Sequence, residues 1–93
     1  GSALIVSGQD FELEVANGRF QQLTTTAASL VCTLPPAGDL EQGGPHFYLQ
    51  NAGGNSITIA DGSTTVLTLA AGTSAVLLVY SVASAQAYVG VTL

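Results

Sequence analysis

The chain has 93 residues, of which one is basic and six are acidic, so charged side chains make up only 8% of it and the net charge is −5 at pH 7. Soluble domains ordinarily carry about 25% charged residues. A single basic residue, Arg19, cannot neutralise the several phosphates that nucleic-acid binding requires, and it gives little attraction to anionic lipid. The length allows one domain, and we expect neither a nucleic-acid partner nor a membrane partner.

The chain opens with a short apolar segment. Gly1-Ser2 is typical of the scar left when an expression tag is cleaved, so a single β-domain is placed at residues 3–93. Its first part, residues 3–8, is an apolar arm that ends at a glycine. The arm either forms an edge strand of its own domain or adds a strand to the sheet of a partner.

A β-hairpin is expected next. Residues 11–15 alternate apolar and acidic side chains, the pattern of a half-buried strand. Asn17-Gly18 is the strongest short hairpin signal, because a type I′ turn needs positive φ at both central residues. Pairing of 11–15 with 19–23 across this turn predicts one shared apolar face made of Phe11, Leu13, Val15 and Phe20.

Further strands are expected where short apolar or alternating runs lie between turn residues. These runs cover residues 30–34, 46–50, 55–60, 64–70, 75–80 and 87–93. Residues 37–45 are expected to be an exposed loop with a single helical turn at 39–41. Turn signals recur at the spacing of a sandwich or barrel, so we predict an all-β fold, a small antiparallel β-sandwich or jelly-roll-like domain.

A tract without charge points to assembly. Residues 62–93 carry no formal side-chain charge, and within them residues 75–80 are apolar on both faces of the expected strand. Such a strand is covered on both faces, either by loops of its own chain or by a neighbouring subunit. Taken with the N-terminal arm, it gives the candidate residues of an interface with another protein chain: Leu4, Ile5, Val6, Leu77, Val79 and Tyr80.

Few residues suggest chemistry. Cys32 lies in an apolar run and is expected to be a small buried hydrophobic residue. The acidic residues around Glu12 are interpreted as a solvated strand face, with a cation site as the alternative. His46 and the two aromatic residues after it form either a core cluster or a sugar-stacking patch. No nucleophile, base and orienting group occur together, so we expect no enzyme, no cofactor and no metal.

The order of motifs from Leu34 onward resembles a known kind of domain. Leu34-Pro35 ends a strand, an aromatic strand closes in Asn51-Ala52-Gly53, and an Ile57-Thr58-Ile59 strand follows. An Asp61-Gly62 turn and a Gly72-Thr73-Ser74 strand start complete the pattern. This order is similar to a small β-domain of tailed-bacteriophage virion proteins, which occurs in head decoration (cement) proteins, head fibres and tail-fibre modules.

The resemblance implies a structural virion protein. A decoration protein of this sort forms a homotrimer on the exterior of the expanded capsid, where it contacts the major capsid protein and stabilises the head. The alternative is a receptor- or glycan-binding module of a phage fibre or a bacterial surface protein. For that alternative, the candidate sugar-stacking residues are Tyr48, Tyr80 and Tyr88.

Overall fold

The computed structural model describes residues 2–14, 18–35, 46–79 and 88–93. Over these ranges the chain forms strands and no helix, so the all-β prediction is confirmed. The strands are β1 (Ser2–Ser7), β2 (Phe11–Glu12), β3 (Phe20–Thr25), β4 (Leu30–Thr33), β5 (His46–Asn51), β6 (Ile57–Asp61), β7 (Thr64–Leu69), β8 (Ser74–Val79) and β9 (Tyr88–Thr92).

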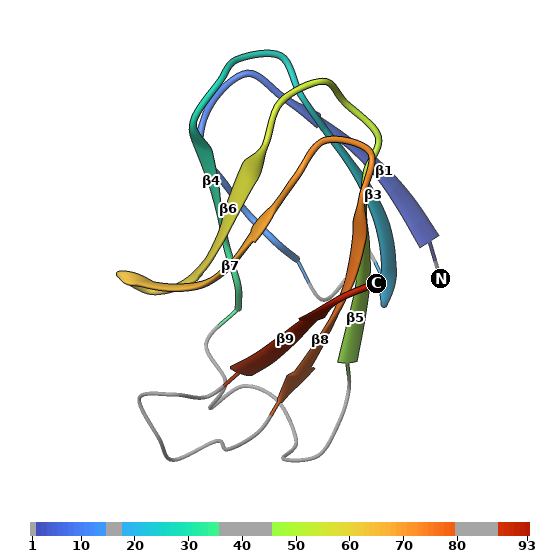
Figure 1. Ribbon diagram of the computed structural model, residues 1–93, viewed down its shortest axis with the longest axis vertical. Coiled ribbons are helices and arrows are strands. Elements are labelled where there is room, and N and C mark those ends of the chain that lie inside the picture. The colour runs from blue at the N-terminus through green and yellow to red at the C-terminus, as the bar shows by residue number, and fades with distance from the viewer. Residues whose placement is uncertain (1, 15–17, 36–45, 80–87) are drawn as a thin grey trace.

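The strands form two sheets that face each other, as in a β-sandwich (Figure 1). One sheet has five strands in the order β1-β3-β5-β8-β9, and the other has four strands in the order β2-β4-β6-β7. From β1 to β6 the chain passes from one sheet to the other at every connection. Consecutive strands in this part of the chain therefore lie in opposite layers.

This alternation makes the sheets mixed, so the expectation of antiparallel sheets is wrong. Strands that return to the same sheet after one visit to the other run in the same direction, and β1 with β3, β3 with β5, β2 with β4 and β4 with β6 are parallel. Antiparallel pairing occurs between β6 and β7, which are consecutive strands of the same sheet. It also joins β5 to β8 and β8 to β9.

The predicted hairpin around Asn17-Gly18 is also wrong. Phe11 and Glu12 pair with β4, whereas Phe20 to Thr25 pair with β1 and β5 in the other sheet. The turn signal is local, but the partners of both strands are distant in sequence. Gln21 takes the inward position next to Phe20, where its side chain is fully buried and its Nε2 donates to the carbonyls of Glu14 and Gly18 at 3.0 and 2.8 Å. Phe20 therefore points away from the core.

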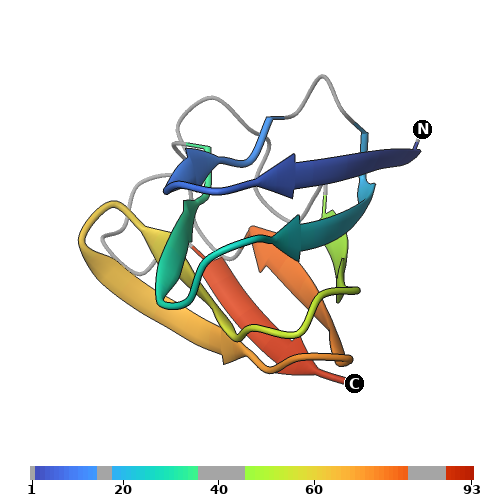
Figure 2. The same cartoon turned by 90° about the horizontal axis from the view of Figure 1, so that it is seen from above.

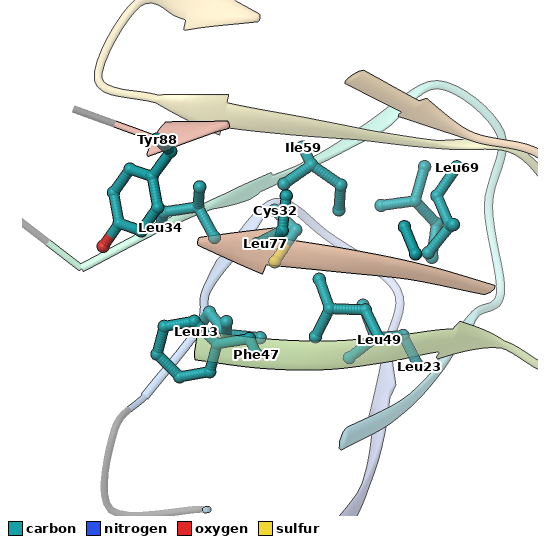
Figure 3. Close-up of a cluster of buried hydrophobic side chains, with 12 residues drawn as sticks. Leu13, Leu23, Cys32, Leu34, Phe47, Leu49, Ile59, Leu69, Leu77 and Tyr88 are labelled. Carbon is teal, nitrogen blue, oxygen red and sulfur yellow. The ribbon is translucent and has the colours of Figure 1, made fainter. Parts of the chain in front are cut away.

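The core lies between the two sheets and takes alternate residues from their strands (Figure 3). The five-stranded sheet contributes Leu23, Phe47, Leu49, Leu77 and Tyr88. The four-stranded sheet contributes Cys32, Ile57, Ile59 and Leu69, and the connecting segments add Leu13 and Leu34. The expected alternation of Ile57 and Ile59 toward the core is confirmed.

A glycine allows the two sheets to approach along β7 and β9 (Figure 2). Gly90 lies opposite Leu77 on β8. A Cβ atom placed on Gly90 would collide with the side chain of Leu67 and would lie 2.9 Å from Cδ2 of Leu77 and 3.2 Å from Cγ1 of Val66. At this margin, β9 is therefore covered by side chains of β7.

A buried amide connects the sheets at the end of β5. Asn51 is fully buried, and its Nδ2 donates to the carbonyls of Asn55 at 2.7 Å and Leu69 at 3.0 Å. Its Oδ1 accepts the N–H of Gly53 at 3.1 Å. Because Leu69 is the last residue of β7 and Asn51 the last of β5, this side chain joins the end of a strand in the four-stranded sheet to the end of a strand in the five-stranded sheet.

The later strand predictions agree with the structure to within a few residues. The expected strands at 30–34, 46–50, 55–60, 64–70, 75–80 and 87–93 correspond to β4 to β9. The expected loop at 37–45, with its helical turn, lies outside the described residues.

Candidate interaction surface

The exposed large hydrophobic residues of the described chain gather on one side of the molecule. On the strands they belong without exception to the five-stranded sheet, and Leu93 directly follows its last strand. Alternation places them on the outer surface, because their neighbours in sequence point into the core. We name this surface the apolar face, which consists of Leu4, Val6, Phe20, Tyr48, Val76, Leu78, Val89 and Val91.

Strand register arranges these side chains in rows across the sheet. Phe20 lies opposite Tyr48, Tyr48 opposite Val76, and Val76 opposite Val91, so four neighbouring strands contribute one apolar row. Leu78 and Val89 form a second apolar pair beside this row. Directly opposed side chains on one face of a sheet lie close enough to contact each other. The apolar face is therefore continuous from β3 to β9.

Two aromatic rings form the most prominent part of this surface. The rings of Phe20 and Tyr48 are stacked, with centroids 6.1 Å apart and an interplanar angle of 23°. Phe20 remains 51% exposed and Tyr48 39% exposed. Such rings bury a large area when a partner covers them.

A polar row borders the aromatic pair. Gln22 lies opposite Gln50 and also opposite Leu4 of β1. A shallow, open hollow of about 260 Å³ lies here, lined by Ala3, Leu4, Phe20 and Gln22. The amides provide hydrogen-bonding groups without adding charge.

No formally charged residue occupies an outward position of β1, β3, β5, β8 or β9 in the described ranges. Arg19, just before β3, is the nearest charged residue in sequence. The acidic residues Asp10, Glu12, Glu14 and Asp61 lie on or beside strands β2 and β6 of the other sheet.

The outer surface of the four-stranded sheet has a different composition. Thr58 lies opposite Thr68, and Thr33 lies opposite Glu12, so hydroxyl and carboxyl groups dominate this side. The half-buried Val31 is its main apolar contribution. The two outer surfaces of the sandwich therefore suit different environments.

The predicted interface residues divide between the face and the core. Leu4 and Val6 are 76% and 70% exposed on edge strand β1, whereas Ile5 between them packs partly against the core. Leu77 is fully buried in the core of its own chain. Val79 ends β8, where it pairs with Tyr88, and Tyr80 lies outside the described residues.

Sequence reasoning missed several residues of the apolar face. Alternation along β8 and β9 places Leu78, Val89 and Val91 on the outer surface, but only if Leu77 and Tyr88 are already known to point inward. The hairpin pairing predicts that Phe20 shares one face with Phe11, but the two residues lie in different sheets and Phe20 points outward. The residue pattern alone does not tell which of two neighbouring apolar side chains points inward.

Three of the residues singled out in the sequence, Cys32, Phe47 and Tyr88, are buried in the structure. Cys32 is a free, buried thiol, and burial raises its pKa to about 12, so the prediction of a buried hydrophobic role is confirmed. Phe47 belongs to the core, as the cluster interpretation predicted, while Tyr48 is outside it. Tyr88 is buried, and its hydroxyl donates to the carbonyl of Pro35 at 2.6 Å.

Over the described ranges, no group of three or more His, Cys, Asp or Glu residues is arranged to hold a metal ion. Asp10 instead accepts the N–H of Val31 through Oδ1 at 2.9 Å. In the same ranges, no helix is long and apolar enough to cross a membrane.

Comparison with known proteins identified no relative: no protein-family model, curated protein or solved structure matches this chain.

Proposed function

We propose that this chain is a structural virion protein, a capsid decoration (cement) protein that forms a homotrimer on the exterior of the expanded head of a tailed bacteriophage. The order of motifs from Leu34 to Ser74 supports the class of protein. The single observation that carries an assembly role is that the exposed large hydrophobic residues of the described ranges lie on the outer side of one sheet and at its end. Large exposed apolar patches mark surfaces that other proteins cover.

The physical role of such a protein follows from linkage. Packaged DNA presses outward on the expanded shell. A protein that binds the expanded shell and not the unexpanded one stabilises the former by mass action. The major capsid protein is the partner in this proposal, and neither a cofactor nor a catalytic residue takes part.

The experiment is a binding assay with heads of the phage that encodes the chain. Purified protein is sedimented with expanded heads and, in parallel, with unexpanded heads. We expect saturable binding to expanded heads and a higher temperature of DNA release from the decorated heads. Binding to neither form, or equal binding to both without any gain in head stability, would overturn the decoration function.

A receptor- or glycan-binding module is the second candidate, and the exposed Phe20–Tyr48 stack favours it. Of the other two tyrosines considered, Tyr88 is buried and Tyr80 lies outside the described residues. Titration with neutral oligosaccharides tests this candidate. Saturable binding that is lost in Phe20→Ala and retained in Thr68→Ala would support a glycan site in place of the decoration role.

A further inference from the structure

The apolar face consists of two unlike halves. On β1, β3 and β5 lies an aromatic half, which we define as Leu4, Val6, Phe20 and Tyr48. On β8 and β9 lies a valine half, defined as Val76, Leu78, Val89 and Val91. The aromatic half has large rings and the hollow beside Leu4, whereas the valine half has short, branched side chains.

We propose that a second copy of this chain covers the apolar face, with the aromatic half of one copy packed against the valine half of the next. This inference rests on the trimer of the proposed function. A ring with three-fold symmetry needs a heterologous contact, in which two different patches of each chain meet. Two unlike halves on the outer side of one sheet satisfy that requirement.

Charge favours a copy of the same chain as the occupant. The chain carries a net charge of −5, and its described acidic residues lie on or beside the four-stranded sheet. Two copies that meet through their five-stranded sheets bring together surfaces whose described residues carry no formal charge. A strongly charged partner would find no counter-charge on this face.

The area of the face approaches what a stable assembly needs when both contacts of each copy are counted together. Strands lie about 4.8 Å apart and rise about 3.3 Å per residue, so five strands of five to six residues present a flat area of roughly 450 Å². Removing one copy from a closed ring exposes its whole face and two matching halves, roughly 900 Å² of flat area and more of accessible surface. A stable interface needs about 1,000 Å² in total.

Complementing variants test this arrangement. Leu4→Lys/Phe20→Lys places two ammonium groups in the aromatic half, and Val89→Lys/Val91→Lys places two in the valine half. Burial of an uncompensated charge opposes association strongly. The matched control is Thr65→Lys/Thr68→Lys, which adds the same charge at exposed positions of the four-stranded sheet. Masses are measured by light scattering and sedimentation equilibrium, and folding is checked by circular dichroism.

The wild type and the control are expected to have three times the mass of one chain, and each face variant alone the mass of one chain. A mixture of the two face variants retains one intact contact, since the valine half of the first variant still matches the aromatic half of the second. We expect this mixture to approach the mass of two chains at concentrations up to about 1 mM, where even a weak contact is populated. If a lysine variant fails to fold, threonine is introduced at the same two positions and the masses are measured again.

The outcomes separate this inference from the proposed function. A wild-type monomer would overturn both the inference and the trimer. A trimer that persists in the folded face variants, or a mixture that stays at the mass of one chain, would overturn only the inference. An intact trimer that fails to bind expanded heads would overturn only the decoration function.

Discussion

Phe20 on β3 and Tyr48 on β5 stack across two neighbouring strands on the outside of the five-stranded sheet, one residue in sequence away from the buried Gln21 and Phe47. The same two strands therefore carry an inward position that builds the core and an outward position that remains exposed. An aromatic side chain whose only role was to fill the core would point inward, whereas Phe20 and Tyr48 point outward. This relationship separates the residues that stabilise the fold from those available to a partner.

The two phenylalanines provide a direct comparison. Phe47→Ala creates a cavity in the core and is expected to lower the free energy of unfolding by about 3–5 kcal/mol. Phe20→Ala removes an exposed cross-strand partner and is expected to cost about 1 kcal/mol or less. Urea unfolding in the Val89→Lys/Val91→Lys background removes the contribution of association. Equal costs for the two variants would contradict the assigned outward position of Phe20.

Asn51 is expected to be a major polar determinant of stability. Asn51→Ala leaves the carbonyls of Asn55 and Leu69 without the donor that they have in the native state, at a cost of about 3 kcal/mol. Asn51→Asp keeps the size of the side chain but, when ionised, cannot donate to either carbonyl. In urea unfolding at pH 7, both variants should therefore have a clearly lower free energy of unfolding than the wild type.

The exposed Gln50 is the matched control for Asn51. Gln50→Ala is expected to change the free energy of unfolding by no more than about 0.5 kcal/mol. An Asn51→Asp variant as stable as the wild type would show that the two donated hydrogen bonds do not hold the sheets together.

Gly90 is expected to resist substitution. The Cβ of Gly90→Ala would overlap the Leu67 side chain and press on the fully buried Leu77, so accommodation requires the sheets to shift. Overpacking of this kind costs about 1–3 kcal/mol. Thermal unfolding measures the effect. Gly54→Ala is the control, because nothing lies within 4 Å of the added Cβ atom.

The pKa of the Cys32 thiol gives a pH-dependent prediction. Burial raises this pKa from 9.0 to about 12 in the folded chain, so the folded state holds its proton at a pH where the unfolded state has lost it. The contribution to stability is full below pH 9 and is lost as the pH rises from 9 to about 12. Between these two pH values, this one group lowers the free energy of unfolding by about 1.4 kcal/mol for each pH unit.

Cys32→Ala isolates this effect. The free energy of unfolding of the wild type should fall more steeply above pH 9 than that of Cys32→Ala, although the alanine variant is less stable at pH 7. A thiol reagent at pH 8 should react slowly with the folded wild type and fully with the unfolded chain. Rapid reaction in the folded state would contradict the burial of this thiol.

Local patterns predicted most of the strands because alternation and turn residues act over a few positions. The Ile57 and Ile59 alternation and the later turns are examples, and Cys32 was assigned to the core by its apolar neighbours. Pairing partners were not predictable in this way. The Asn17-Gly18 signal favours a hairpin, yet long-range contacts place Phe11 beside Cys32 and Phe20 beside Tyr48.

The candidate surface was predicted only in part, for the same reason. Leu4 and Val6 are outward on an edge strand, as an apolar arm would place them. Leu77 is in the core because alternation along β8 points it inward and leaves Leu78 outside. A run such as 75–80, apolar on both faces, identifies a strand with two apolar sides without telling which side meets a partner.

The proposed assembly requires that protein covers the apolar face. The most direct test is the mass of the wild-type chain, measured by light scattering coupled to size exclusion over a range of micromolar concentrations. We expect three times the mass of one chain, with a shift toward the mass of one chain on dilution. A mass of one chain throughout the micromolar range, with the face exposed, would contradict the proposed assembly.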